Sequence, residues 1–289
     1  MRLGDAPESG NVEYDSGRGG GGMGGLGGGL FGLLFQIVAS RFGIVGIIVL
    51  ALGYCALTSL GGLGGGGGST TASTSPDGGG IKVDPNTDKF ARQVLGSTEQ
   101  VWGDLFKQSG ATYSPTTLHF YSNAGSSGCG TAQSAMGPFY CPSDKKIYLD
   151  AAFFDELSRR FQAPGDFAQA YVIAHEVGHH IQDLQGTLGQ AQAAQARAGT
   201  ASGNAIQVGV ELQADCYAGV WAKRSGALEA GDIEEGMRAA EAIGDDTLQK
   251  EAQGRVTPDS FTHGSSAQRM EALQRGLANG DPAQCTYTK

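Results

Sequence analysis

The sequence predicts an α+β fold, with a small sheet and a mainly α-helical remainder behind a Gly-rich N-terminal region. Three observations carry this prediction. The composition is ordinarily globular only after residue 80, since 26 of the 49 glycines lie before it. In the rest of the chain, short β-type segments follow one helical segment, and the other segments with helical spacing of apolar residues come after them. Strands and helices segregated in this way are typical of α+β domains, and about 209 residues suffice for a substantial core.

The N-terminal region divides into three segments. Residues 1–41 and 61–80 are rich in glycine and bury too little apolar surface to offset the entropy of ordering, so we predict a disordered segment and a linker. Residues 42–60 carry no charge over 19 residues, which is long enough for a transmembrane helix; a buried core segment is the alternative. Arg41 before this span favours a cytoplasmic N-terminus. The sequence therefore predicts a single-pass protein of the cell membrane whose domain, residues 81–289, is extracytoplasmic.

The charge of the chain excludes one class of partner. The net charge is −9 and the pI is near 5.0. Nucleic-acid binding needs a clustered basic surface, whereas the basic residues here are scattered, with never more than two in a row. We therefore expect no nucleic-acid partner.

The cysteines give a separate indication of the compartment. Cys55 lies in the apolar span, and the other four, Cys129, Cys141, Cys216 and Cys285, fall in the domain. An even number suits two disulfides in an oxidising environment, and three pairings are possible. We favour Cys129–Cys141, which closes a short loop, with Cys216–Cys285, which ties the C-terminal tail to a helix. Buried free thiols are the alternative.

The first half of the domain supplies one helix and the predicted sheet. Residues 88–110 place apolar side chains at helical spacing. Residues 117–122 alternate between apolar and polar and predict a strand, and the Gly/Ser-rich residues 125–130 predict a loop. F-Y-C-P and K-I-Y-L-D, residues 139–142 and 146–150, predict a hairpin with P-S-D-K as its turn.

The second half of the domain is predicted to be helical. A short helix begins near residue 151 and ends at Pro164. Asp166 is expected to cap the next helix, which runs to about Leu184. Residues 187–203, rich in Gln, Ala and Gly, are weakly specified. Further helices are expected at about 205–223, 229–253 and 264–278.

The stretch A-Y-V-I-A-H-E-V-G-H-H-I-Q-D-L-Q-G holds three of the five histidines. H-E-V-G-H puts His175 and His179 four residues apart, on one face of a helix. Two imidazoles suit Zn²⁺, and a catalytic zinc takes a third protein ligand and keeps a position for water. Glu176 points about 100° away around the helix, toward the water and not the metal. We therefore predict one zinc ion per chain, with Glu176 as the general base; ordinary core or surface histidines are the alternative.

The third ligand is expected from E-L-Q-A-D, where Glu211 and Asp215 share one face of another helix. Glu211 would bind zinc, and Asp215 would accept the free N–H of a liganding histidine and fix its tautomer. Apolar neighbours indicate that the pair is buried, and buried carboxylates need a cation or hydrogen-bond donors. A solvated acidic face is one alternative. Another is a cysteine ligand, Cys129 or Cys141, which would resemble the peptide deformylases.

Several motifs resemble the bacterial neutral zinc metallopeptidase family over nearly the whole chain. The matching stretches are the Gly-rich N-terminus with its apolar span, C-G-T-A-Q-S-A-M-G-P-F-Y-C-P-S-D-K-K-I-Y-L-D, A-H-E-V-G-H-H-I-Q, E-L-Q-A-D-C-Y-A-G-V-W-A, P-D-S-F-T-H-G-S-S-A-Q-R and G-D-P-A-Q-C. The resemblance implies a zincin-like metalloprotease domain anchored in the membrane. H-E-x-x-H followed by E-x-x-x-D also resembles the gluzincins, in which the glutamate is the third ligand and the aspartate supports a ligand. These roles carry onto Glu211 and Asp215.

The C-terminal segment departs from other gluzincins, so the resemblance transfers no donor for the oxyanion that peptide hydrolysis develops. We predict this role for His263 in S-F-T-H-G-S-S; a structural histidine is an equal alternative. Arg269, Tyr217 and Tyr148 are weaker candidates.

Together these inferences predict a membrane-anchored, zinc-dependent endopeptidase that hydrolyses peptide bonds with a zinc-activated water and a Glu general base. Its partner is a peptide or protein substrate, which would add as a strand to an exposed sheet edge, for which K-I-Y-L-D is the expected edge. The alternative is a catalytically silent, zinc-stabilised extracytoplasmic binding module. Glu176 favours the enzyme, because a structural site has no use for a free carboxylate there. His180 is expected to support the site or to lie at the surface, and His119 is expected to be structural.

Overall fold

Four short strands form the main sheet of the computed structural model, which describes residues 1–4, 6–15, 81–159 and 163–286. β1, β2 and β6 run parallel, and β5 runs antiparallel to β6. The predicted α+β class, the predicted strand and the predicted hairpin are confirmed. In spatial order the strands are β1 (Val12–Tyr14), β2 (Thr117–Tyr121), β6 (Lys146–Asp150) and β5 (Phe139–Cys141).

β6 is not an edge strand, contrary to the prediction. It lies between β2 and β5, and Tyr148 in its middle is 3% exposed. Among the described strands, β1 and β5 occupy the two ends of the sheet. The apolar run of β6 is explained by this central position, because a central strand of a covered sheet is buried on both faces.

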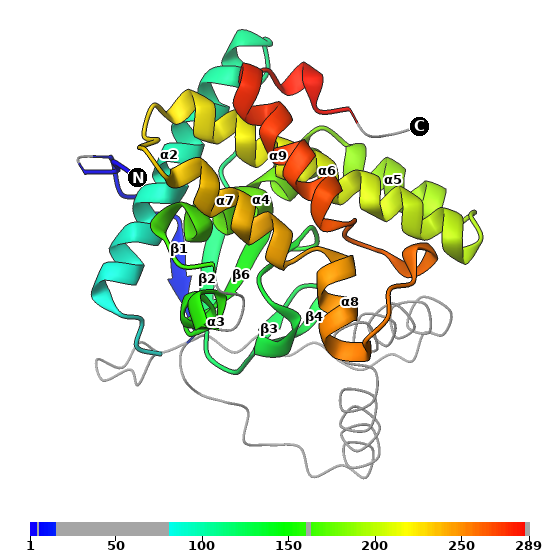
Figure 1. Cartoon of the computed structure of the whole chain (residues 1–289). Coiled ribbons are helices and arrows are strands. Elements are labelled where there is room, and N and C mark those ends of the chain that lie inside the picture. The colour runs from blue at the N-terminus through cyan, green and yellow to red at the C-terminus, as the bar shows by residue number, and fades with distance from the viewer. Residues whose placement is uncertain (5, 16–80, 160–162, 287–289) are drawn as a thin grey trace, which may run out of the picture. The chain divides into compact units, whose positions relative to one another are not determined.

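Helices cover most of the remaining described chain (Figure 1). Asp84 caps α2 by accepting hydrogen bonds from the backbone N–H groups of Asn86 and Thr87. The largest fully buried side chains include Trp102 of α2 and Trp221 of α6, so the core lies among the helices as well as on the sheet. The helices are α2 (Pro85–Gln108), α3 (Phe153–Arg159), α4 (Asp166–Leu184), α5 (Thr187–Gln195), α6 (Thr200–Ser225), α7 (Asp232–Ala242), α8 (Asp245–Gln253) and α9 (Ser266–Asn279).

One prediction about the helices is wrong, and one segment that the sequence left open proves helical. Asp166 is the first residue of α4 and makes no capping hydrogen bond there; Gly165 precedes the helix. Residues 187–195, which the composition left weakly specified, form α5, which packs against α6 and α4. Tertiary packing therefore stabilises a helix that the local sequence does not specify.

Two glycines set how closely the long helices approach one another. A Cβ atom on Gly219 of α6 would lie 2.3 Å from the backbone oxygen of Leu273 in α9. A Cβ atom on Gly178 of α4 would lie 3.0 Å from the Cα atom of Ala214 in α6. Neither position has room for a side chain. Gly178 therefore brings H-E-V-G-H directly against E-L-Q-A-D.

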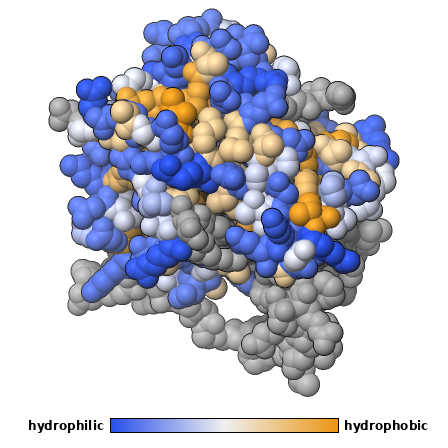
Figure 2. All heavy atoms as spheres, in the orientation of Figure 1, coloured by the Kyte–Doolittle hydropathy of each residue, from blue (hydrophilic) through white to orange (hydrophobic). Residues whose placement is uncertain are grey.

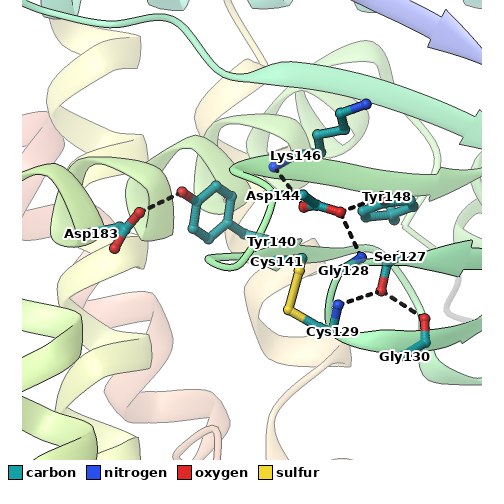
Figure 3. Close-up of a disulfide and its surroundings, with 10 residues drawn as sticks. All are labelled: Ser127, Gly128, Cys129, Gly130, Tyr140, Cys141, Asp144, Lys146, Tyr148 and Asp183. Carbon is teal, nitrogen blue, oxygen red and sulfur yellow. Dashed lines mark hydrogen bonds between the residues drawn. A yellow bond between two sulfur atoms is a disulfide. The ribbon is translucent and has the colours of Figure 1, made fainter. Parts of the chain in front are cut away.

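The Gly/Ser-rich segment predicted as a loop forms a second sheet of two antiparallel strands, β3 (Ala124–Ser127) and β4 (Gly130–Gln133). Cys129, in its turn, is bonded to Cys141 at the end of β5 (Figure 3). The second predicted disulfide, Cys216–Cys285, joins α6 to the C-terminal segment. Both pairings are confirmed.

Polar contacts also attach this hairpin to the β5–β6 turn, and attach β5 to α4 (Figure 3). Asp144 accepts hydrogen bonds from the backbone N–H of Gly128 at 2.6 Å and from the Tyr148 hydroxyl at 2.7 Å. The Tyr140 hydroxyl donates to Asp183 of α4 at 2.8 Å. The edge strand β5 is thereby fixed to the helix that carries H-E-V-G-H.

The first residues of the chain belong to this fold, so the prediction that residues 1–41 are disordered is wrong for their described part. β1 pairs with β2 from Val12 to Tyr14. Earlier in the segment, a Cβ atom on Gly96 of α2 would lie 2.2 Å from the backbone oxygen of Pro7, which shows how closely the two backbones pack. The rest of that segment, the predicted span and the predicted linker, residues 16–80, lie outside the described residues.

The predicted membrane topology is wrong as well. One span between the N-terminus and the domain would put them on opposite sides of a membrane. β1 and β2, however, are neighbours in one sheet and must share a compartment. None of the described helices is long and apolar enough to cross a membrane.

Large apolar side chains are largely absent from the described surface. On the face shown in Figure 2, apolar residues form small patches separated by hydrophilic ones. The exposed large apolar residues of the described chain are Tyr14, Met136, Ile233 and Val256.

Candidate metal centre

Three potential ligand atoms from two helices meet at one point. The Nε2 atoms of His175 and His179 on α4 lie 3.1 Å apart. Oε2 of Glu211 on α6 lies 3.2 Å from the first and 3.5 Å from the second. Tetrahedral zinc with bonds of about 2.0–2.1 Å has ligand atoms about 3.3 Å apart. The spacing of these three atoms fits one zinc ion.

Hydrogen bonds on the far side of each ring determine which nitrogen faces this point. Nδ1 of His175 lies 2.7 Å from Oδ1 of Asp215, and Nδ1 of His179 lies 2.9 Å from Oε1 of Gln182. Both partners are acceptors, so both Nδ1 atoms carry hydrogen. In the neutral rings, both Nε2 lone pairs then face each other and the Glu211 carboxylate. Three electron-rich atoms at these distances need either a proton on one of the rings or a cation between them, and the spacing suits zinc.

Asp215 accepts hydrogen bonds from other residues besides His175. Arg269 of α9 donates to both of its oxygens, from Nε and from Nη2, each at 2.9 Å. The Tyr171 hydroxyl donates to Oδ1 at 2.6 Å. Asp215 is fully buried and Arg269 is 3% exposed. Arg269, predicted as a weaker candidate to stabilise the oxyanion, therefore has a different position. Its guanidinium forms a bidentate ion pair with Asp215, the carboxylate that contacts His175.

Glu176 differs from the other acids of this region. It is 7% exposed, and among the described residues none donates a hydrogen bond to its carboxylate or forms an ion pair with it. Glu211 and Asp215, by contrast, have each oxygen engaged. In the described part of the chain, the fully enclosed polar atoms without a partner belong to other residues, so the Glu176 oxygens remain open to a bound molecule. Its place one residue from His175 suits a base that accepts a proton from a bound molecule.

His263 lies beside the centre without sharing a hydrogen bond with the three ligand atoms. Its loop packs on α6 next to Glu211, since a Cβ atom on Gly264 would lie 3.3 Å from Val208. Asp245 accepts a hydrogen bond from the His263 backbone N–H at 2.6 Å and lies 3.4 Å from the ring Nδ1. Burial lowers the pKa of His263, but Asp245 and the charge of Glu211 together raise it above its usual value.

Other candidates lie away from the centre. His180 is fully buried and contacts the Tyr140 hydroxyl and the Ser114 carbonyl, so its role is structural. His119 lies on β2, with its ring against Tyr148. Tyr217 donates to Gln185. The cysteine alternative for the third ligand is excluded because Cys129 and Cys141 are bonded to each other.

Zinc binding should release about one proton at neutral pH. Burial lowers the pKa of His175, but Asp215 and Glu211 more than offset this and raise it to about 10. The metal-free protein therefore keeps His175 protonated below that pH, and zinc must displace the proton. We expect zinc affinity to rise with pH from about 7 to 10. Calorimetric titrations in two buffers of different ionisation enthalpy measure the proton release, and a value near zero at pH 7.5 would contradict the expectation.

Sequence reasoning did not identify Gln182, Arg269, Tyr171 or Asp245 as supports of the centre. Gln182 has a local signal, because it follows His179 by three residues on the same helix. Tyr171 has one too, because it precedes His175 by four residues on α4. Arg269 and Asp245 reach Asp215 and His263 from α9 and α8, and their spacing in the sequence carries no signal.

Comparisons with known proteins identify the family of the chain. Residues 1–287 match the family described as "Putative neutral zinc metallopeptidase". "Uncharacterized protein YpfJ" of Escherichia coli K12 is 44% identical over 292 residues, covering 99% of this chain and 98% of that protein. "Uncharacterized protein Rv2575" of Mycobacterium tuberculosis H37Rv is 42% identical over 204 residues, covering 65% of this chain and 66% of that protein. No solved structure matches. The chain, including the N-terminal residues that form β1, belongs to the neutral zinc metallopeptidase family.

Proposed function

We propose that this protein is a zinc-dependent endopeptidase, with His175, His179 and Glu211 as the ligands of one zinc ion and Glu176 as the general base. The observation that carries the proposal is the unpartnered carboxylate of Glu176 beside three lone-pair atoms at tetrahedral spacing. A purely structural zinc site needs a fourth ligand and no free base. The Nε2 atoms of both histidines and the carboxylate of Glu211 fit a catalytic site with three protein ligands.

The residues of the chain divide the chemistry among them. Zinc bound here would make a water more acidic and polarise the carbonyl of the scissile peptide bond. Glu176 accepts the proton of the attacking water and passes it to the leaving amine, since its carboxylate has no other partner. Asp215 orients His175, and Gln182 orients His179.

His263 is the proposed donor to the developing oxyanion. Its support is the loop position beside Glu211 and the carboxylate of Asp245 near its Nδ1, which raises the pKa of His263 and favours the imidazolium, whose Nε2–H can donate. We expect His263→Ala to lower kcat about 10²- to 10³-fold with little change in KM or zinc content. Asp245→Asn should give a smaller loss of the same kind. Full turnover by His263→Ala would remove this histidine from the mechanism.

We also propose that the fold is zincin-like and that a substrate lies as an extended strand along β5. β5 is an edge strand among the described strands, runs antiparallel to its neighbour and contacts α4. Peptides commonly bind as an added strand on such an edge. A crystal structure with a bound peptide inhibitor tests this, and an inhibitor paired with β1 would contradict it.

One experiment separates an endopeptidase from a silent zinc-binding module. It must use the full chain, because a variant starting at residue 81 would lack β1. The purified protein with its disulfides intact is assayed for zinc content and for cleavage of a diverse peptide library by mass spectrometry. We expect one zinc per chain, cleavage that a chelator abolishes, and recovery with added zinc. One zinc per chain without cleavage of any peptide would favour the binding module, and a lack of zinc would contradict both.

A further inference from the structure

His179 is connected to the C-terminal end of the chain by a continuous row of hydrogen bonds. Gln182, fully buried on α4, accepts from Nδ1 of His179 at 2.9 Å. The Nε2 of Gln182 donates to Oε1 of Gln213 on α6 at 2.9 Å. The Nε2 of Gln213 donates to the backbone oxygen of Cys285 at 2.8 Å. Cys285 is 1% exposed and is bonded to Cys216 on α6.

The direction of this row is fixed at its far end. The backbone oxygen of Cys285 can only accept, so Gln213 must point its amide nitrogen toward it and its amide oxygen toward Gln182. Gln182 must then present nitrogen to Gln213 and to the backbone oxygen of Val210, which lies 2.7 Å away. Its oxygen is left for His179. Turning either amide over would place two acceptors or two donors against each other in a buried site, which is costly.

The two histidines are therefore supported by different means. His175 is oriented by a charged carboxylate, Asp215, itself paired with Arg269. His179 is oriented by a neutral amide whose own orientation depends on the tail of the chain. Neither Gln213 nor Cys285 shares a hydrogen bond with any of the three ligand atoms.

We propose that Gln182 and Gln213 form a positioning relay through which the disulfide-anchored tail fixes the tautomer and ring orientation of His179, and hence the retention of zinc. This rests on the proposed zinc site. The disulfide holds the Cys285 carbonyl against α6, and the position of that carbonyl sets the orientation of the Gln213 amide. The Gln213 amide in turn sets the orientation of the Gln182 amide, which contacts His179. Loss of the Cys216–Cys285 bond would free the carbonyl and let both amides rotate.

Zinc affinity of the folded full chain, measured by competition with a fluorescent chelator, tests the relay. We expect Gln182→Met to weaken zinc binding about 10- to 100-fold, as loss of a hydrogen bond to a liganding histidine does. Gln213→Met should weaken it by up to about tenfold in the same direction. The control is Gln93→Met, which removes another buried glutamine that donates to the backbone oxygen of Gly4. It should lower the melting temperature and leave zinc affinity unchanged.

The role of the tail is tested by the double variant Cys216→Ala/Cys285→Ala, which keeps the other disulfide. We expect it to weaken zinc binding as Gln213→Met does. Combining all three changes should add little, because they interrupt one relay. Cobalt-substituted protein should show the same order of change in its visible spectrum.

The outcomes separate the relay from the proposed function. Wild-type zinc affinity in both Gln213→Met and the cysteine variant would overturn the relay while the zinc site stands. Full additivity of the cysteine and Gln213 changes would likewise overturn it, since the tail would then act by another route. Absence of zinc from the wild type would contradict the proposed site itself. A wild type that binds zinc but cleaves nothing contradicts only the peptidase.

Discussion

Glu176→Gln is expected to keep one zinc per chain and to lower kcat by about 10²- to 10⁴-fold, the range in which general acid–base catalysis contributes. The change is nearly isosteric and removes only the ability to accept a proton. The Glu176 carboxylate has no hydrogen-bond partner among the described residues, so its loss breaks no interaction there. Stability should be unchanged or slightly higher, because a nearly buried charge has been removed. Turnover of the most rapidly cleaved library peptide and zinc content are measured on the same sample.

The matched control is Glu234→Gln on the exposed surface of α7, which should leave both turnover and zinc content at wild-type values. Three results discriminate the possible roles of Glu176. Loss of turnover with zinc retained supports the base. Loss of zinc would make Glu176 a ligand, and retention of both would place the base elsewhere in the protein.

The sequence predicts those parts of the centre that depend on a single helix. H-E-V-G-H places two imidazoles on one face of α4 because of the helical period alone, and Glu211 and Asp215 share a face of α6 for the same reason. The strand T-L-H-F-Y and the β5–β6 hairpin are also local patterns. These features could be derived without knowing how the elements pack.

The remaining features depend on contacts between distant parts of the chain. β1 pairs with β2, more than a hundred positions away, through only three residues. Their sequence, V-E-Y, does not distinguish them from a disordered segment. The topology prediction failed for that reason, since it treated the N-terminus as independent of the domain. The helical structure of residues 187–195 and the central position of β6 likewise arise from packing partners. A pattern of period two cannot distinguish an edge strand from a central strand when both are apolar.

Arg269→Met is expected to destabilise the metal-free protein by up to about 3–5 kcal/mol, because it removes the guanidinium that pairs with both oxygens of the fully buried Asp215 and leaves the protonated His175 as its cation. Burial alone would raise the pKa of Asp215, but the charges of Arg269 and His175 lower it to about 2. A lowered pKa in the folded state adds stability above the unfolded value of about 3.9, and this stability is lost as the pH falls toward 2. Without Arg269 the pKa of Asp215 rises, so the variant should also unfold at a higher pH in an acid titration.

Denaturant unfolding in the presence of a chelator measures this effect. The control is Arg275→Met on the same helix, which removes a partner of Glu271 at the surface and should cost no more than about 1 kcal/mol. A second variant, Asp215→Asn with Arg269→Met, removes both charges and should be no less stable than Arg269→Met alone, because most of the penalty comes from the buried Asp215 charge that has lost its arginine. If Arg269→Met and Arg275→Met lower the free energy of unfolding by the same amount, the Arg269–Asp215 pair contributes no more stability than a surface ion pair. The orientation of His175 would then depend on Asp215, Tyr171 and helix packing, without a contribution from Arg269.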